Sequence, residues 1–289
     1  MGKTGMSAVQ TLSQTRCILG EGALWHPERG SFFWFDILGH KLFEHDGSAQ
    51  REWSFDRAVS AAGWIDDGKL LVASEVDLFV FDLDTGAAEH IVPLEADQPA
   101  NRSNDGRADP FGGFWIGTMG YACEQGAGAI YRYYRGELRK IVSDITITNA
   151  ICFAPDGRSA CFGDTPKQTI WRVALDDEGW PVGDREVFVD MSAEPGVQPD
   201  GAVIDTAGRL WTAQWGMSRV ACYGTDGTLD HVVPMPARQV SCPSFGGPDR
   251  RRLFVTSASE GLPEGQAGGQ TYYVDLDGVQ GQKEHRVVL

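Results

Sequence analysis

Long apolar runs are missing from this sequence of 289 residues, and so is any sustained helical period of apolar positions. A helix that crosses a membrane needs about 20 consecutive apolar residues, so no membrane span is expected. The first twenty residues also lack the apolar stretch and cleavage site of a secretory signal peptide. We therefore expect a cytoplasmic protein, with residues 1–8 forming a disordered N-terminus.

Basic residues are scarce. Lys and Arg number 25 against 40 Asp and Glu, which gives a formal net charge of −15. Nucleic acids and anionic membrane surfaces are bound through clustered Lys and Arg, and the sequence has no such cluster. Neither is expected as a partner, which leaves a small molecule as the expected partner class. The sequence is compatible with a monomer and with a small homo-oligomer.

Cysteine and histidine patterns that bind metals are absent as well. The six cysteines form no Cys-x-x-Cys pair, and none of the six histidines has the spacing of a metal-ligand pair. The cysteines are interpreted as buried, reduced thiols, which suits an intracellular protein. A metal site in this chain is therefore expected to use oxygen ligands.

What the sequence does contain is a repeat. In each unit a short apolar strand runs into a turn, and counting six residues back from the turn defines one equivalent position per unit. These positions lie 40, 43, 45, 51 and 42 residues apart, which is the spacing of β-propeller blades and not of helical repeats. The equivalent residues are Glu21, Ala61, Asn104, Asn149, Asp200 and Cys242.

Each unit continues with an aromatic-rich second strand, such as Phe32 to Phe35, and with two more short strands between Gly and Asp turns. The pattern predicts an all-β fold, a six-bladed β-propeller with four-stranded blades that forms one domain over residues 1–289. Closing the ring removes free sheet edges. The run from Val9 to Ile18 precedes the first unit and is expected to pair with the last blade as its outer strand.

The first strand of each propeller blade lines the central channel, so the equivalent positions should meet at one end of it. Glu21, Asn149 and Asp200 together supply three oxygens and a charge of −2, a ligand set that suits a divalent cation. We expect one such ion, with Ca²⁺, Zn²⁺, Mg²⁺, Mn²⁺ and Fe²⁺ all compatible. The alternative is that these residues begin strands and bond to their own backbone as turn formers.

Two nearby stretches are candidates for substrate contacts. Arg102 offers a planar fork of donors for sugar hydroxyls, a carboxylate or an oxyanion, and Asn104 can both donate and accept hydrogen bonds. The same stretch is compatible with a hydrated loop, because Asn-Asp-Gly is a strong turn signal. The polar loop 121–128 is interpreted as a lid over the channel mouth.

Several motifs follow one another in the order of the repeat. They are Gly20-Glu21-Gly22 with Trp25, Asn101-Arg102-Ser103-Asn104-Asp105-Gly106, Trp115-Ile116-Gly117-Thr118-Met119, Asn149 ahead of Ala154-Pro155-Asp156-Gly157, Pro199-Asp200-Gly201, and Phe245-Gly246-Gly247-Pro248-Asp249. Together they resemble the gluconolactonase/regucalcin (senescence marker protein-like) family of sugar lactonases, from about Leu19 to Ser259.

The resemblance implies a carboxylic ester hydrolase that opens a pentono- or hexonolactone, such as arabinono-, xylono-, galactono- or gluconolactone, to the aldonic acid. It implies a divalent metal at Glu21, Asn149 and Asp200 and substrate contacts from Arg102 and Asn104. Given that chemistry, Asp200 is the candidate general base.

One departure from the family pattern concerns the loop after Gly-Thr-Met. Some members carry a carboxylate two to four residues after this motif, but Tyr121 and Ala122 stand there in this chain. Glu124 is the nearest acid, so Tyr121 and Glu124 are the candidate substrate contacts in this loop.

Two other functions fit the same residues. A calcium-dependent phosphotriesterase or arylesterase would use the same cation beside an apolar pocket. A calcium-binding propeller without enzymatic activity would use the fold alone, since a fold does not fix a function.

Overall fold

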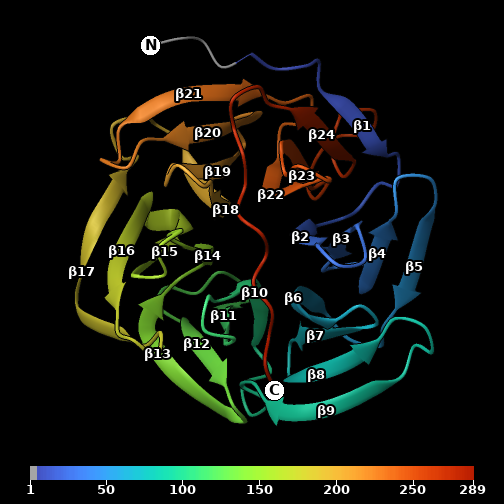
Figure 1. Ribbon diagram of the computed structural model, residues 1–289, viewed down its shortest axis with the longest axis vertical. Helices are drawn as coiled ribbons and strands as arrows, with labels where there is room; N and C mark the ends of the chain where they lie inside the picture. The colour runs from blue at the N-terminus through green and yellow to red at the C-terminus, as the bar shows by residue number, and fades with distance from the viewer. Residues whose placement is uncertain (1–4) are drawn as a thin grey trace.

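The fold is a ring of six antiparallel sheets, each with four strands, around a central channel (Figure 1). The computed structural model describes residues 5–289. No α-helix occurs among these residues, and a single 3₁₀ turn, η1 (Thr165–Lys167), follows β15. The predicted six-bladed β-propeller with four-stranded blades is therefore confirmed.

The innermost strands of blades 1 to 6 are β2 (Gly20–His26), β6 (Val59–Asp66), β10 (Asn101–Ala108), β14 (Thr148–Phe153), β18 (Gln198–Ile204) and β22 (Val240–Gly246). The second strands are β3 (Ser31–Asp36), β7 (Lys69–Ser74), β11 (Phe114–Gly120), β15 (Ser159–Asp164), β19 (Leu210–Trp215) and β23 (Arg252–Ser257). The third strands are β4 (Lys41–His45), β8 (Asp77–Asp82), β12 (Gly128–Tyr134), β16 (Thr169–Leu175), β20 (Arg219–Tyr223) and β24 (Thr271–Asp275). The outer strands are β5 (Gln50–Ser54), β9 (Ala88–Pro93), β13 (Glu137–Ile145), β17 (Pro181–Asp190), β21 (Leu229–Pro234) and β1 (Gln10–Ser13).

The ring is closed by β1, which pairs antiparallel with β24 as the outer strand of blade 6. This confirms the pairing expected for the run from Val9 to Ile18. Of the first eight residues, for which the sequence predicts disorder, residues 1–4 lie outside the described residues. Met6 forms a β-bridge with Leu276, and the Ser7 amide donates to the Asp275 carbonyl at 3.0 Å.

The core lies between neighbouring blades and is built largely from the second strands. Trp34, Trp115 and Trp211 stand on β3, β11 and β19 and are fully buried. Adjacent blades also stack aromatic rings directly, as Phe32 and Phe254 do with ring centroids 4.5 Å apart. Fully burying such side chains contributes about 1.5–3 kcal/mol each, which holds the blades together.

Every innermost strand carries a register irregularity at or next to the equivalent position of the repeat. The register with the second strand breaks next to Glu21, Ala61, Asn104, Asn149, Asp200 and Cys242. A bulge adds one residue to a strand and re-aims the side chains beside it. The repeated bulge therefore turns the equivalent side chains found in the sequence toward the channel.

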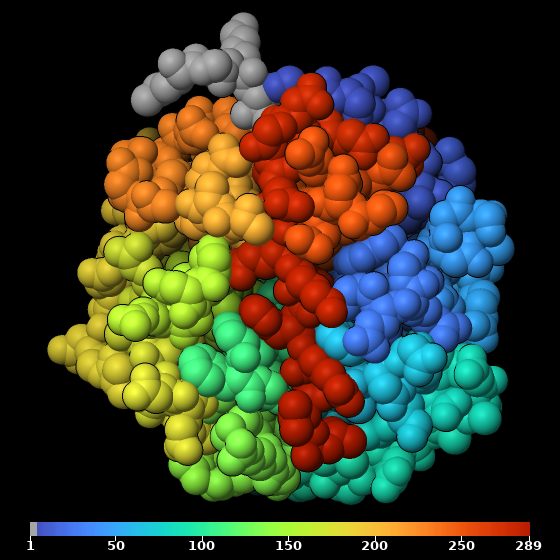
Figure 2. Space-filling model, viewed as in Figure 1, coloured from blue at the N-terminus to red at the C-terminus, as the bar shows by residue number. Residues whose placement is uncertain are grey.

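The C-terminal segment, residues 276–289, crosses one face of the ring and covers that end of the channel (Figures 1 and 2). Gln282 donates to the carbonyls of Phe153 and Ile204 at 2.9 Å each, and the Val287 amide donates to the Trp64 carbonyl at 2.8 Å. The segment thus ties blades 2, 4 and 5 together. No pattern in the sequence predicts this segment. No helix within residues 5–289 has the length and apolar character needed to span a bilayer.

Candidate functional site

A cavity of about 320 Å³ opens at the end of the channel opposite the C-terminal segment. Its floor is formed by four of the six equivalent residues of the repeat. They are Glu21, Asn104, Asn149 and Asp200, from blades 1, 3, 4 and 5. Ala61 and Cys242 occupy the other two positions and are buried without lining the cavity. Residues far apart in sequence are therefore gathered in one place, as the repeat predicts.

The carboxyl groups of Glu21 and Asp200 lie next to each other on this floor. Glu21 is 6% exposed and Asp200 4% exposed. Burial raises the pKa of Glu21 to about 8, with a further upward contribution from Asp105. Burial and the neighbouring charges of Glu21 and Asp105 raise the pKa of Asp200 well above its usual range. At neutral pH and without a bound cation, the two carboxyl groups together therefore retain at least one proton, because burial and their mutual repulsion disfavour two negative charges.

The amide of Asn149 is oriented by a chain of hydrogen bonds. The Thr165 hydroxyl donates to the Pro199 carbonyl at 2.8 Å, so its oxygen is left to accept from Nδ2 of Asn149 at 2.8 Å. This fixes which end of the amide is the oxygen. Oδ1 of Asn149 then faces Nδ2 of Asn104 at 3.3 Å, and it is available as a ligand atom on the cavity floor.

Arg102 stands two residues before Asn104, one layer closer to the cavity mouth. Its guanidinium donates to Oδ1 of Asn104 at 2.7 Å and to the Ser103 carbonyl at 2.9 Å. Nδ2 of Asn104 donates to the Thr148 carbonyl at 2.9 Å. The two side chains are thus fixed to each other, and among residues 5–289 the Arg102 guanidinium is the only cationic group that lines the cavity.

Tyr121 also lines the cavity, and its ring lies 5.9 Å from the Arg102 guanidinium. The Tyr121 hydroxyl donates to Glu75 at 2.6 Å, and burial together with Glu75 raises the pKa of Tyr121 to about 12. Tyr121 therefore stays neutral and links blade 3 to blade 2 across the rim. Glu124 is exposed and is not among the cavity-lining residues, whereas Cys123 is.

An apolar rim, which the repeat offset does not predict, surrounds this polar floor. The rim residues are Leu19, Leu38, Met119, Ile147 and Trp215. Leu19 and Ile147 stand two residues before Glu21 and Asn149, as Arg102 does before Asn104. Counting two residues further back from each turn would have identified Leu19 and Ile147, because alternate residues of a strand face the same way. Leu38 and Trp215 come from loops or strand ends that the repeat does not specify.

A family comparison decides where this chain belongs. The family described as "SMP-30/Gluconolactonase/LRE-like region" matches residues 19–259. The chain belongs to the SMP-30/gluconolactonase/LRE-like family. That match begins at the first blade and ends after β23, so it includes all the cavity-floor residues.

Several known proteins are similar to this member of the SMP-30/gluconolactonase/LRE-like family over most of its length. The crystal structure of a calcium-binding protein, regucalcin, from Agrobacterium tumefaciens str. C58 has a TM-score of 0.94, is 40% identical, and covers 98% of each chain. An L-arabinolactonase of Azospirillum brasilense is 36% identical over 261 residues, 88% of this chain and 85% of that protein. A pentonolactonase of Haloferax volcanii is 34% identical over 265 residues, 90% of this chain and 88% of that protein.

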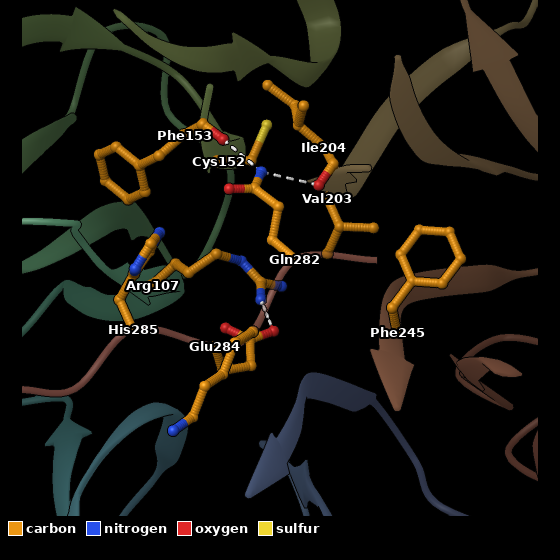
Figure 3. A pocket seen from close by; sticks show the side chains of 10 residues that line it. Arg107, Cys152, Phe153, Val203, Ile204, Phe245, Gln282, Glu284 and His285 are labelled. Carbon is orange, nitrogen blue, oxygen red and sulfur yellow. Dashed lines mark hydrogen bonds and ion pairs between the residues drawn. The ribbon is translucent and has the colours of Figure 1, made fainter. Parts of the chain in front are cut away.

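In this member of the SMP-30/gluconolactonase/LRE-like family, two other clusters of interacting side chains lie outside the cavity. At the opposite end of the channel, Arg107 pairs with Glu284 of the C-terminal segment inside a small pocket (Figure 3). In blade 5, Cys222 on the third strand β20 and Asp230 and His231 on the outer strand β21 bring ligand atoms within 4.8 Å of one another. Burial raises the pKa of the Cys222 thiol to about 12, which makes it a poor metal ligand.

Proposed function

We propose that this chain is a metal-dependent sugar lactonase that hydrolyses a pentono- or hexonolactone to the aldonic acid. The observation that carries the proposal is the convergence of Glu21, Asn149 and Asp200 on one cavity floor, with Arg102 and Asn104 beside them. The similarity to an L-arabinolactonase and a pentonolactonase supports the same substrate class.

The residues on the floor fit a divalent cation. Buried carboxylates are normally paired with a cation or coordinate a metal, and here two of them adjoin with raised pKa values. The amide oxygen of Asn149 completes a set of hard oxygen ligands that Ca²⁺, Mg²⁺, Mn²⁺, Zn²⁺ or Fe²⁺ can use. A cation held by Glu21, Asn149 and Asp200 would polarise a lactone carbonyl and lower the pKa of a nearby water.

Asp200 is proposed as the general base. Its ionised carboxylate takes the proton from water as the water oxygen forms its bond to the lactone carbonyl carbon. It returns that proton to the ring oxygen as the ring carbon–oxygen bond breaks, so the product is the open hydroxy acid. A positioned base of this kind contributes about 10²–10⁴-fold to a rate.

Arg102 and Asn104 are proposed to orient the lactone ring. Because they are hydrogen-bonded to each other at 2.7 Å, the free Arg102 donors have a fixed direction toward the cavity. Preorganised donors of this kind hold hydroxyls or a developing oxyanion without rearranging during the reaction. The Tyr121 side chain would form the wall of the lactone-binding space on the side of Arg102.

The direct test is a pH-indicator assay over a panel of pentono- and hexonolactones, run on the whole chain after chelation and again with each divalent metal. We expect acid release from at least one lactone, loss of activity on chelation and recovery with added metal. No turnover of any lactone with any metal would contradict the proposal and favour a calcium-binding propeller without enzymatic activity.

The apolar rim favours a second candidate, a calcium-dependent arylesterase or phosphotriesterase. Leu19, Met119 and Ile147 offer no strong hydrogen bonds to a sugar but would pack against an aryl group. The same assay therefore includes phenyl acetate and an organophosphate. A kcat/KM for these compounds above that for every lactone would select the second candidate.

A further inference from the structure

Asp105 breaks the pattern of the ring. The residue after each equivalent position is small or apolar in five blades, and only blade 3 has a charged side chain there. The six residues are Gly22, Ala62, Asp105, Ala150, Gly201 and Pro243. Asp105 is 5% exposed, and it does not line the cavity. A buried carboxylate at this place needs a structural or functional reason.

The Asp105 carboxylate reaches across to blade 4. Its Oδ2 accepts the backbone N–H of Ile151 at 2.7 Å. The register of β14 with β15 pairs Asn149 with Gly163 and next pairs Cys152 with Cys161, so Ala150 and Ile151 form the bulge. Asp105 thus provides the acceptor for an amide that the bulge removes from the strand ladder.

The bulge contains a backbone conformation that needs such support. Ala150 has φ = 57°, in the left-handed region, although it carries a Cβ. Non-glycine residues adopt this region only when the surrounding structure holds them there. Asn149 directly precedes Ala150, so the direction of its amide depends on this backbone.

Asp105 is also electrostatically close to the cavity floor, since its charge contributes to the raised pKa values of both Glu21 and Asp200. Burial raises the pKa of Asp105 to about 6, against the opposing effects of the Ile151 amide and of Arg107 on its other side, and Arg107 in turn pairs with Glu284 at 2.5 Å. Asp105 therefore sits between the cation-binding floor and the ion pair at the far end of the channel.

We propose that Asp105 is a positioning residue, which aims the Asn149 oxygen at the cation by holding the Ala150–Ile151 bulge across the blade boundary. The proposal rests on the cation site of the proposed function. Residues that orient metal ligands in this indirect way typically affect metal affinity by about 10–100-fold.

The test compares Asp105→Leu, which removes the acceptor, with Asp105→Asn, which retains an acceptor oxygen and removes the charge. Asp205→Asn is the matched control, because Asp205 is also buried and accepts the amides of Ala207 and Arg209 at 2.9 Å in a turn away from the cavity. The measurements are calorimetric titration with Ca²⁺ and with Mn²⁺, and hydrogen exchange of the Ile151 amide in the full chain.

For Asp105→Leu we expect a dissociation constant about 10–100-fold higher and faster exchange at Ile151. Asp105→Asn should keep Ile151 protected and lose less affinity, and Asp205→Asn should bind as the unmodified chain does. Equal affinity losses in the Leu and Asn variants, with Ile151 still protected in the Asn variant, would assign the effect to charge and overturn the positioning role.

Glycine at position 150 supplies a rescue, because glycine adopts the left-handed region freely. Adding Ala150→Gly to Asp105→Leu should recover part of the lost affinity, about fivefold, while Ala150→Gly alone changes it little. No recovery in a folded double variant would contradict the proposal, and so would Asp105→Leu binding as tightly as the unmodified chain. Cation binding without turnover of any lactone would instead reject the proposed function and leave the role of Asp105 standing.

Discussion

The carboxyl groups of Glu21 and Asp200 adjoin on the cavity floor although they come from blades 1 and 5. Burial raises the pKa of both carboxyl groups, and the charge of Glu21 raises that of Asp200 further. A divalent cation would remove that cost by pairing with both carboxylates. Most of the measurable consequences of the proposed site follow from this pair.

Replacing Asp200 by Asn should abolish most of the lactonase activity, because the amide cannot accept the proton from water. We expect kcat to fall by about 10²–10⁴-fold. The measurement is kcat from steady-state kinetics at saturating metal, together with a check of the metal occupancy of the variant. Near-full activity with the metal bound would show that Asp200 is no base.

Stabilisation by the cation should grow as the pH rises. The pKa of Glu21 is raised from 4.5 to about 8 in the folded chain. The stability that a raised carboxyl pKa contributes is fully present below the unfolded value and is lost as the pH rises through the folded value. The metal-free protein should therefore lose stability between about pH 5 and pH 8, whereas the cation-bound form should not.

Thermal unfolding with saturating Ca²⁺ and with chelator, at pH values from 5 to 8, measures this difference. The Tm difference should widen across that window in the unmodified chain and flatten in Glu21→Gln. A difference that stays the same from pH 5 to pH 8 would mean that the carboxyl pair does not bind the ion.

Arg102→Lys should raise KM more than it lowers kcat if Arg102 orients the lactone in the ground state. Lysine keeps the charge but loses the planar fork that is fixed against Asn104. We expect KM to rise by about tenfold, equivalent to one hydrogen bond to a charged group. Arg172→Lys, at an exposed pair with Glu186, is the control and should leave both constants unchanged. A loss confined to kcat would place Arg102 at the developing oxyanion instead.

Glu284→Gln should destabilise the fold, because it leaves the Arg107 guanidinium buried without its partner. Both side chains are 9% exposed. Removing one member of a buried pair costs about 3–5 kcal/mol. Glu137→Gln is the matched control, since its pair with Arg139 is more than half exposed and solvent screens it, so losing this pair should change the stability little. Urea unfolding compares the two, and equal small losses would show that the C-terminal segment does not anchor the channel.

The repeat made much of this architecture predictable from sequence. A fixed offset before each turn identified Glu21, Asn104, Asn149 and Asp200 as neighbours, because equivalent residues of successive blades face one channel. Counting a fixed number of residues back from each turn identifies these residues because a bulge recurs at or next to the equivalent position of each innermost strand. The sequence repeat and the folded structure agree at these positions, and this agreement makes the residues of the cavity floor predictable from sequence.

Features outside the repeat were not predictable in the same way. The C-terminal segment has no periodicity, and its contacts are mostly to backbone carbonyls, as with Gln282. In the loop after β11, Cys123 has φ = 55° and lines the cavity, whereas Glu124 does not. A single left-handed residue decides which side chain faces inward, and the composition of a polar loop does not reveal it.

The proposed cation site is tested most directly by a crystal structure of this chain soaked with Mn²⁺, in which anomalous scattering locates the ion. One ion should lie on the cavity floor, with oxygens of Glu21, Asn149 and Asp200 at about 2.1–2.4 Å, near the ligand distances of small divalent ions. An ion bound elsewhere, or no ion at a concentration that supports turnover, with these three side chains directed apart, would contradict the proposed site.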